Sequence, residues 1–362
     1  MSDTGSTPLG RLIARRIALT GPITVAEFMA EALGHPTLGY YRRAPAVGGA
    51  GDFITAPEIS QMFGELVGAW LADRWQAMGA PPAVRLVELG PGRGVLLADA
   101  LRATRSVPGF HAALDLHLVE TNAVLRAEQQ SRLAAFSPAW HERLEEVPDG
   151  PLLLVANEFF DALPVRQFHR TAGGWHERMV GLSADGETLA FALAPGITPF
   201  APLLPDAAAG AEAELSEPAR AIAAGIGARI RRHGGWALIV DYGYDKGHGA
   251  SLQAVRGHRG ASILERPGDT DLSAHVDFAA LAVASGARSF GPVGQGAFLT
   301  QLGIVHRAET LKARASDEQH RAVDAALRRL IDADQMGTLF RVLAMGDDRS
   351  AQPAGFVEAL SD

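Results

Sequence analysis

The chain has 362 residues, of which 47% are hydrophobic and 20% charged, with a formal net charge of -8 and no cysteine. The lack of cysteine excludes disulfides, thiolate catalysis and zinc–thiolate sites, and the negative charge argues against broad nucleic-acid binding, which depends on Lys and Arg. No apolar run reaches the roughly 18 residues of a membrane-spanning helix, and the first residues lack the apolar core of a signal peptide. We therefore expect no integral membrane segment, no nucleic-acid partner and a bacterial-type cytoplasmic location.

Two helical patterns open the chain. Apolar residues recur at helical spacing over residues 8–33 and again over residues 58–79. Thr24, with Glu27 three positions later, predicts a capping box between them. Residues 34–57 are rich in Gly, Pro and aromatics and predict a long ordered loop. We expect a helical N-terminal cap over residues 1–80 and a main domain over residues 81–362.

From residue 85 onward, short apolar runs alternate with helical patterns. Buried strands are predicted at 85–89, 114–120, 151–156 and 236–243, and helices at 95–104, 123–133 and 218–233. Residues 165–193 predict an antiparallel meander and residues 194–218 a surface loop, so we expect an insertion around 165–220. The alternation predicts an α/β fold with a doubly wound, mostly parallel sheet. In such sheets, ligands bind beyond the carboxyl ends of the strands.

The first predicted strand runs into E-L-G-P-G-R-G, from Glu88 to Gly94. Glycines at alternate positions allow a sharp turn and a close approach of ligand to backbone. A dinucleotide fingerprint would need a glycine at position 95, which is Val95, and a Walker loop would need G-K-S/T. The pattern resembles motif I of class I S-adenosyl-L-methionine (SAM) methyltransferases, and the alternative is a tight turn with incidental glycines. The resemblance implies cofactor binding by Glu88, Gly90, Pro91, Gly92 and Gly94.

Glu120 ends the second predicted strand. A carboxylate at this point can accept hydrogen bonds from both ribose hydroxyls of an adenosine ligand. The alternative is that Glu120, Thr121 and Asn122 only begin a helix. Given the glycine loop, we expect Glu120 to bind the cofactor.

The third predicted strand is followed by N-E-F-F-D, from Asn157 to Asp161. If the methyl acceptor is a cation, a carboxylate can orient it and offset its charge, and it can pair with a guanidinium in bidentate geometry. We expect Glu158 to take this role, with Asp161 as the second candidate, and Asn157 and Phe159 to join the cofactor site. The alternative is that Asp161 caps a helix and that the two phenylalanines belong to the core.

Three further groups of residues leave two interpretations open. Tyr242 and Tyr244 after the fourth strand could line the acceptor channel, while Asp241 could instead hold a loop through backbone amides. A polar segment before the second helix could close over the site as a lid or pack as a plain cap; its residues are Asp52, Thr55, Pro57, Glu58 and Gln61. Ser273, His275 and Asp277 could join the pocket, although Asp277 is also a good helix N-cap.

With these blocks in view, the chain is identified as a member of the MidA-like family of SAM-dependent methyltransferases, over about residues 20–345. The match begins with VAEFMAEALGHPTLGYYRR (25–43) and, toward its end, includes PGDTDLSAHVDF (267–278) and GPVGQGAFLTQLGI (291–304). Its much more specific blocks are GDFITAPEIS (51–60) and NEFFDALPV (157–165). The resemblance implies a class I methyltransferase fold, SAM as cofactor and methylation of protein arginine. It also implies relatives in the mitochondrial matrix that assist assembly of respiratory complex I. The family usually reads D-Y-G-H after the fourth strand, where this chain has Tyr244, and a later family histidine appears as His258.

Hydrolase chemistry is disfavoured by the sequence. The 12 histidines are scattered without an H-E-x-x-H pair, so we expect no metal site, and no G-x-S-x-G elbow is present. We therefore predict a methyltransferase that acts on a protein arginine, with a complex I subunit as the candidate substrate. Two alternatives stay open: a non-catalytic assembly factor that uses the fold as a binding module, and a small-molecule methyltransferase with a closed pocket. The oligomeric state is also open, with a homodimer as one option.

Overall fold

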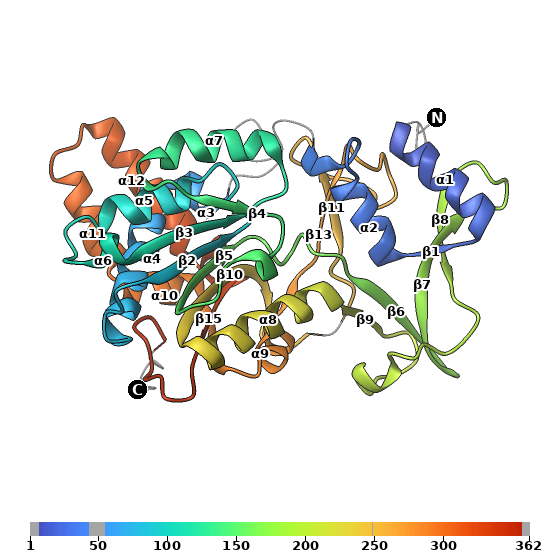
Figure 1. The fold of residues 1–362 in the computed structure, drawn as a ribbon. Coiled ribbons are helices and arrows are strands. Elements are labelled where there is room, and N and C mark those ends of the chain that lie inside the picture. The colour runs from blue at the N-terminus through green and yellow to red at the C-terminus, as the bar shows by residue number, and fades with distance from the viewer. Residues whose placement is uncertain (1–6, 43–54, 248, 357–362) are drawn as a thin grey trace.

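The elements of the chain gather in two regions, which Figure 1 shows side by side. The computed structural model describes residues 7–42, 55–247 and 249–356. The first region is built on an eight-stranded mixed sheet, and we call it the sheet region. The other carries the N-terminal helices and two smaller antiparallel sheets, of five and three strands, and we call it the second region.

The large sheet is mostly parallel. Strands β10, β5, β2, β3 and β4 run parallel to their neighbours, whereas β16 runs antiparallel to both β10 and β15. The order across the sheet is β15 (Arg288–Gly294), β16 (Phe340–Gly346), β10 (Gly235–Tyr244), β5 (Leu152–Asn157), β2 (Val84–Leu89), β3 (Leu114–Val119) and β4 (Ala139–His141), and β14 (Val276–Asp277) pairs with the end of β10. The prediction of a doubly wound α/β fold is confirmed.

Helices bury both faces of this sheet, which is why its central strands are almost continuous apolar runs. In β2, Val84 and Leu86 point into one core, whereas Val87 and Leu89 point into the other. The first face is covered by α3 (Ala56–Ile59), α4 (Gln61–Ala77), α5 (Val95–Ala103), α6 (Phe110–Ala113), α7 (Ala123–Leu133), α10 (Gln295–Gln301), α11 (Ile304–Lys312), α12 (Asp317–Ile331) and α13 (Met336–Leu339). The second face is covered by α8 (Glu217–His233) and α9 (Phe278–Ser285).

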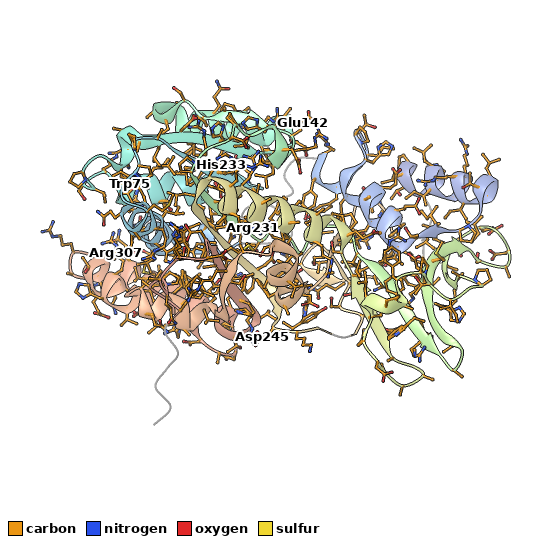
Figure 2. The ribbon with its side chains drawn as sticks, turned by 60° about the horizontal axis from the view of Figure 1, so that its bottom comes forward. Trp75, Glu142, Arg231, His233, Asp245 and Arg307 are labelled. Carbon is orange, nitrogen blue, oxygen red and sulfur yellow. The ribbon has the colours of Figure 1, made fainter. Side chains whose placement is uncertain are left out.

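A buried carboxylate joins three of the helices on the first face. Arg307 of α11, labelled in Figure 2, donates to both oxygens of Glu65 in α4 at 2.7 and 3.0 Å. Arg102 of α5 donates to the same carboxylate at 3.0 Å. Because a buried charge is costly unless it is paired, these contacts fix α4, α5 and α11 relative to one another.

The second region is assembled from three separate stretches of chain. The first supplies α1 (Pro8–Thr20), β1 (Ile23–Thr24), α2 (Val25–Gly34) and the 3-10 helix η1 (Tyr40–Arg42); the second supplies β6 (Arg166–Thr171), β7 (Gly174–Leu182), β8 (Leu189–Leu193) and β9 (Glu212–Leu215); the third supplies β11 (Gln253–Arg256), β12 (Arg259–Gly260) and β13 (Asp271–Ser273). Strand β1 pairs with β7, and the hydroxyl of Thr7 donates to the carbonyl of Pro267 at 2.9 Å. Phe28, Val180 and Leu272, one from each stretch, share a single core.

Local predictions were mostly correct. The capping box is confirmed, since the Thr24 hydroxyl accepts from the Glu27 amide at 3.1 Å and the Glu27 carboxylate accepts from the Thr24 amide at 2.9 Å. The helix expected over 58–79 is two helices, because Ser60 is extended and caps α4 with its side chain. The surface loop expected over 194–218 was wrong in part: residues 212–215 form β9, because β6 offers an antiparallel partner for them.

The division expected at residue 80 does not follow the two regions. Helices α1 and α2 lie in the second region, whereas α3 and α4 pack on the large sheet. The domain limits of 1–80 and 81–362 stay a prediction. None of the helices in the described part of the chain is both long enough and apolar enough to cross a membrane.

Candidate active site

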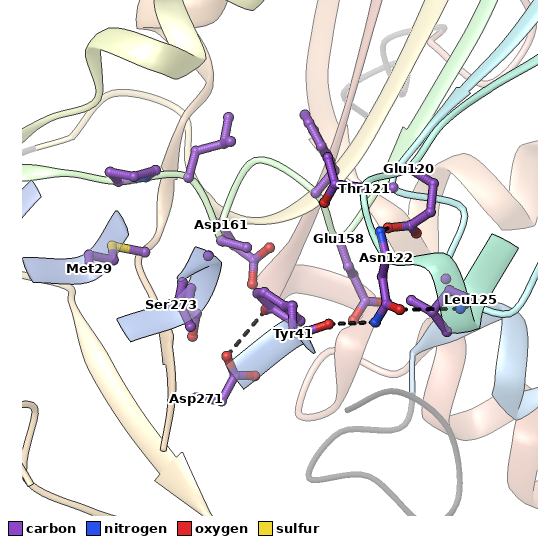
Figure 3. A pocket seen from close by; sticks show the side chains of 18 of the residues that line it. Met29, Tyr41, Glu120, Thr121, Asn122, Leu125, Glu158, Asp161, Asp271 and Ser273 are labelled. Atoms are coloured by element: carbon purple, nitrogen blue, oxygen red, sulfur yellow. Dashed lines mark hydrogen bonds between the residues drawn. The ribbon is translucent and has the colours of Figure 1, made fainter. Parts of the chain in front are cut away.

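A cavity of about 440 Å³ lies where the carboxyl ends of β2, β3, β5 and β10 meet the second region. A smaller hollow of about 70 Å³ adjoins it and shares Thr55, Gly90, Gly92 and Glu158 as lining residues. The sheet region also lines the large cavity with Glu120, Asn122, Phe159, Asp161 and Tyr242, and the second region with Met29, Leu33, Tyr41, Asp271 and Ser273. Figure 3 shows side chains from the two regions facing one another across this space.

The glycine loop after β2 forms part of the wall of both spaces. Gly90, Gly92 and Gly94 have φ angles of +62°, +51° and +75°, in the left-handed region that favours glycine. A Cβ atom on Gly90 would lie 2.8 Å from the ring of Phe159. Gly94 lines neither space and instead precedes α5, next to Gln129. The loop therefore exposes the backbone of Gly90 and Gly92 to a ligand.

Two buried acceptors line the smaller hollow without a hydrogen-bond partner. They are Oε2 of Glu88, a residue that is 3% exposed, and Oδ1 of Asn157. Burial, together with the nearby charge of Glu120, raises the pKa of Glu88 to about 8. Because an unsatisfied buried acceptor is costly, this hollow suits a ligand that brings N–H donors. The ammonium group of an amino-acid moiety, such as that of SAM, has this character.

Glu120 faces the large cavity from the end of β3. Its Oε1 accepts from the Asn122 amide at 2.7 Å and its Oε2 accepts from Nε2 of Gln129 at 3.3 Å. Burial raises the pKa of Glu120, while these hydrogen bonds oppose the rise. Asn122, rather than Glu120, caps α7, since its Oδ1 accepts from the Val124 amide at 2.8 Å. The helix start therefore falls on Asn122, and cofactor binding by Glu120 stays a prediction.

Glu158 is held in a left-handed backbone conformation with φ of +50°. Its amide donates to the carbonyl of Val240 at 2.9 Å. Its Oε1 accepts from the Ala56 amide at 2.9 Å and from Nδ2 of Asn157 at 3.2 Å. Burial is the main cause that raises the pKa of Glu158 to about 7, and the charge of Asp161 adds to it. The side chain is thus fixed at the wall of both spaces and stays partly protonated near neutral pH.

The contact with Ala56 brings the segment predicted as a lid to the site. Thr55 lines both spaces, and Pro57 and Glu58 line the smaller one. Gln61 lines neither, and Asp52 lies outside the described residues. The start of α3 therefore touches the site, while its closing motion stays a prediction.

The loop that carries Asp161 is held from below by Asp241, which is fully buried. Oδ2 of Asp241 accepts from three successive amides, those of Phe159, Phe160 and Asp161, at 2.9–3.2 Å. Its Oδ1 accepts from the Tyr242 amide at 2.9 Å. Asp241 therefore supports the loop through backbone amides, the role considered for it from the sequence.

Asp161 does not cap a helix, since residues 161–165 form a turn without a helix. Its carboxyl lines the large cavity, and burial raises its pKa to about 6, against the effect of the neighbouring Tyr242 phenol. Of the two phenylalanines, one lies at the site and the other belongs to the core. Phe159 lines the cavity, whereas Phe160 is buried in the core under α8 and α9.

The candidate residues of the fourth strand and of the stretch beyond it line two different cavities. Tyr242 and Ser273 line the large cavity, whereas Tyr244, His275 and Asp277 line a separate cavity of about 80 Å³. Asp277 also caps α9, because its Oδ1 accepts from the Ala280 amide at 2.9 Å. His258 is exposed in the turn between β11 and β12. Neither Tyr244 nor His258 lines the large cavity.

The sequence analysis missed the contribution of the second region. The Tyr41 hydroxyl donates to Oδ1 of Asp271 at 3.2 Å, and Nδ2 of Asn122 donates to the Tyr41 carbonyl. Arg42 donates to the carbonyl of Thr121, beside Glu120. Met29 and Leu33 of α2 add an apolar wall. No local motif gives these positions a role. The only signal was the similarity to the family of two blocks, VAEFMAEALGHPTLGYYRR (25–43), which contains Met29, Leu33, Tyr41 and Arg42, and PGDTDLSAHVDF (267–278), which contains Asp271.

A metal-binding cluster was not expected from the sequence. Among the described residues, no group of three or more His, Asp or Glu side chains could hold a metal ion. The neighbouring carboxyls of Glu158, Asp161 and Asp241 have other contacts. Glu158 and Asp241 accept hydrogen bonds from backbone amides, and Glu158 and Asp161 line the cavity.

Comparisons with known proteins agree with this geometry. Residues 66–293 match a family described as S-adenosyl-L-methionine-dependent methyltransferases. Mouse protein arginine methyltransferase NDUFAF7, mitochondrial, is 37% identical over 94% of this chain and 84% of its own length. The Drosophila melanogaster homologue is 37% identical over 95% of this chain and 86% of its own length. A protein from Burkholderia thailandensis, solved with S-adenosyl-homocysteine bound, superposes with a TM-score of 0.84 and 29% identity over 97% of this chain and 94% of its own.

Proposed function

Because this chain belongs to the family of SAM-dependent methyltransferases, we propose that it methylates a terminal nitrogen of an arginine side chain in a protein. The observation that carries the choice of acceptor is the pair of carboxyls on the cavity wall, Glu158 and Asp161. Two relatives named as protein arginine methyltransferases match this chain almost from end to end. A cationic acceptor is what two such carboxyls would favour.

The residues around the glycine loop fit the cofactor. Gly90 and Gly92, with Pro91 between them, would admit the amino-acid part of SAM, whose ammonium would pair with Glu88 and Asn157. Glu120 would accept hydrogen bonds from the ribose, and Phe159 would flank the adenine. Gly94 would act through the loop, since it lines neither space. Once bound, SAM supplies a methyl group on a positively charged sulfur, which keeps the electron pair when the bond to carbon breaks.

The chain's own task is to orient the acceptor and to take up a proton. A guanidinium nitrogen that forms a bond to the methyl carbon must lose one proton, so that the methylated product keeps a single positive charge. Glu158, with its pKa near 7, is matched to accept that proton at neutral pH. Asp161, whose pKa is also raised by burial, lies on the same wall, where its carboxyl would offset the charge of the guanidinium.

The physiological acceptor follows from the family resemblance and not from the cavity. We propose a subunit of respiratory complex I as the protein substrate, in a bacterial cytoplasm. A non-catalytic assembly factor would have no use for a carboxyl whose pKa is raised to about 7 beside the cofactor site, which favours the enzyme. A small-molecule acceptor would explain the raised pKa of Glu158 no better. It would also leave unexplained why the relatives are named protein arginine methyltransferases.

Mass spectrometry of complex I subunits tests this proposal. A deletion strain is complemented with the wild-type gene or with Glu158→Gln, and cells are grown with methyl-labelled methionine. We expect a labelled arginine that is present with the wild type and absent in the deletion and in the variant. Identical arginine methylation in all strains would overturn the proposal. Tight binding of SAM by the purified chain without any methylated protein would favour the assembly factor instead.

A further inference from the structure

The hydroxyl of Tyr242 is a polar group that the site described so far does not use. Tyr242 is 8% exposed and lines the large cavity from the end of β10. Its oxygen makes no hydrogen bond of ordinary geometry with the described residues, although Asp161, Ser273 and Gln253 are its polar neighbours. Leaving a buried hydroxyl without a hydrogen-bond partner is costly. A hydroxyl at a cavity wall that lacks a hydrogen-bond partner is suited to bind a ligand that supplies one.

The ring that carries this hydroxyl is held firmly. Phe340 and His275 pack against it with their edges, at centroid distances of 5.6 and 5.3 Å. Phe340 is also the partner of Tyr242 in the pairing of β10 with β16. The Tyr242 amide donates to Asp241, the same residue that holds the Asp161 loop. The hydroxyl and the Asp161 carboxyl are therefore positioned by one shared support.

The surroundings of the hydroxyl are acidic and polar. Asp161 lies beside it, and burial together with the charge of Asp161 raises the pKa of Tyr242, so the phenol stays neutral. Ser273 lies on the same wall. Across from them is Tyr41, whose pKa is also raised, first by burial and then by Asp271 and Asp161. Figure 3 shows Asp161, Ser273 and Asp271 gathered around Tyr41.

We propose that the Tyr242 hydroxyl binds the guanidinium of the acceptor directly and is the residue that selects arginine over lysine at this site. A neutral phenol donates one hydrogen bond and can accept another. In the complex, Tyr242 donates to the Asp161 carboxylate and accepts from a guanidinium N–H that is not the one methylated. The Tyr242 hydroxyl and the Asp161 carboxylate then both have hydrogen-bond partners. The inference rests on the proposed function, because it concerns the acceptor of that same site.

The preference for a guanidinium follows from the number and placement of its donors. A guanidinium presents five N–H donors in a fixed plane, whereas an ammonium presents three on a flexible stem. Glu158 and Asp161 already provide carboxylate oxygens for one edge of the plane, so a further acceptor at Tyr242 is useful only to a ligand with donors to spare. The apolar wall of Met29 and Leu33 fits the aliphatic stem of such a side chain.

Two matched variants test the proposal. Tyr242→Phe removes only the hydroxyl, and Tyr244→Phe makes the same change two residues along β10, in the separate cavity. Calorimetry titrates N-acetyl-L-arginine methylamide, and then N-acetyl-L-lysine methylamide, into each full chain saturated with S-adenosyl-homocysteine. Thermal unfolding of each chain without ligand is measured in parallel.

We expect Tyr242→Phe to weaken binding of the arginine probe about tenfold, to leave the lysine probe unchanged, and not to lower the melting temperature, because the lost hydroxyl had no partner. Tyr244→Phe should keep the wild-type preference. Equal affinity of wild type and Tyr242→Phe for the arginine probe would overturn the inference, and so would a wild type that binds both probes alike. If cells show enzyme-dependent arginine methylation in either of those cases, the proposed function stands without this role for Tyr242.

Discussion

The two regions of the molecule contribute to one cavity in opposite ways. In the sheet region, most contributions come from the ends of strands, so Gly90, Glu120 and Glu158 are brought together by the parallel sheet itself. In the second region, the contributions come from α2, η1 and β13, which are joined by pairing between distant stretches of chain. The first arrangement is local and repeats along the chain. The second depends on the complete tertiary structure.

This difference suggests a division of labour. The residues proposed for the cofactor, among them Glu88, Gly92 and Glu120, all belong to the sheet region. The second region adds Met29, Leu33, Tyr41 and Asp271 on the side where we place the acceptor. Changes in the sheet region should therefore affect cofactor binding and transfer severely, whereas changes in the second region should have graded effects.

The most severe expected effect is that of Gly92→Val. Gly92 has a φ of +51°, which a β-branched residue adopts only with strain, and it lines both spaces. We expect the affinity for S-adenosyl-homocysteine, measured by calorimetry, to fall more than about 100-fold, because the side chain fills the ligand's place and distorts the loop.

The matched control for that change is Gly186→Val, in the exposed turn between β7 and β8. Gly186 has a similar φ of +74° and open space around it. It should cost stability by backbone strain and leave the affinity intact. Normal affinity in Gly92→Val would refute the assignment of the glycine loop.

The next effect in size is that of Glu158→Gln. Gln keeps an oxygen for the Ala56 amide but cannot accept a proton, so transfer of labelled methyl to proteins of a deletion-strain extract should fall about 100-fold. Affinity for S-adenosyl-homocysteine should not change. Glu145→Gln, the same change at an exposed position, serves as the control. Unchanged transfer in Glu158→Gln would remove this residue from the acceptor role.

The pH profile sharpens the same prediction. The pKa of Glu158 is raised to about 7, so the carboxyl is protonated and unable to accept a proton below that pH. The wild-type rate should therefore rise as the pH passes upward through about 7, well above the ordinary range of a glutamate. Glu158→Gln should lose this rise. A wild-type rate that is flat between pH 6 and 8, on the order of one unit either side of that pKa, would contradict the role.

The smallest expected effect tests the second region. Arg42→Ala removes the hydrogen bond from η1 to the carbonyl of Thr121, next to Glu120. The loss of one hydrogen bond of about 1 kcal/mol predicts about a fivefold weaker affinity for S-adenosyl-homocysteine. Arg15→Ala, on the exposed face of α1, is the control and should have no effect. An equal loss in both variants would show that charge, and not this contact, is responsible.

The sequence allowed prediction of the sheet region because its information is local. Buried strands such as 151–156 appear as apolar runs, and the residues after them, Asn157 to Asp161, fall at the sheet edge by topology alone. The role of Asp241 as a loop support could only be left open, since an aspartate at a strand end carries no sign of what its oxygens accept.

The second region could not be predicted in the same way. Strand β9 escaped notice because only its pairing with β6 makes Glu212–Leu215 a strand. Tyr41 and Asp271 are separated by 230 residues, so no window of sequence contains both. Ser273 was considered for the pocket because of its alternating neighbours, whereas Asp271 in the same strand was not. Patterns of period and spacing describe one element at a time, and this wall of the cavity exists only between elements.

The interlocking of three stretches in the second region has a consequence for synthesis and folding. The N-terminal segment cannot complete its contacts until the ribosome has made the chain beyond Pro267, whose carbonyl accepts from Thr7. Closing a loop of that length is slow and brings little return until its last contact forms. The proposed acceptor wall thus cannot form before β13 is made, and chains truncated before Asp271 would lack the part of it that Asp271 and Ser273 provide. Grafting this region onto another methyltransferase would require moving three segments together.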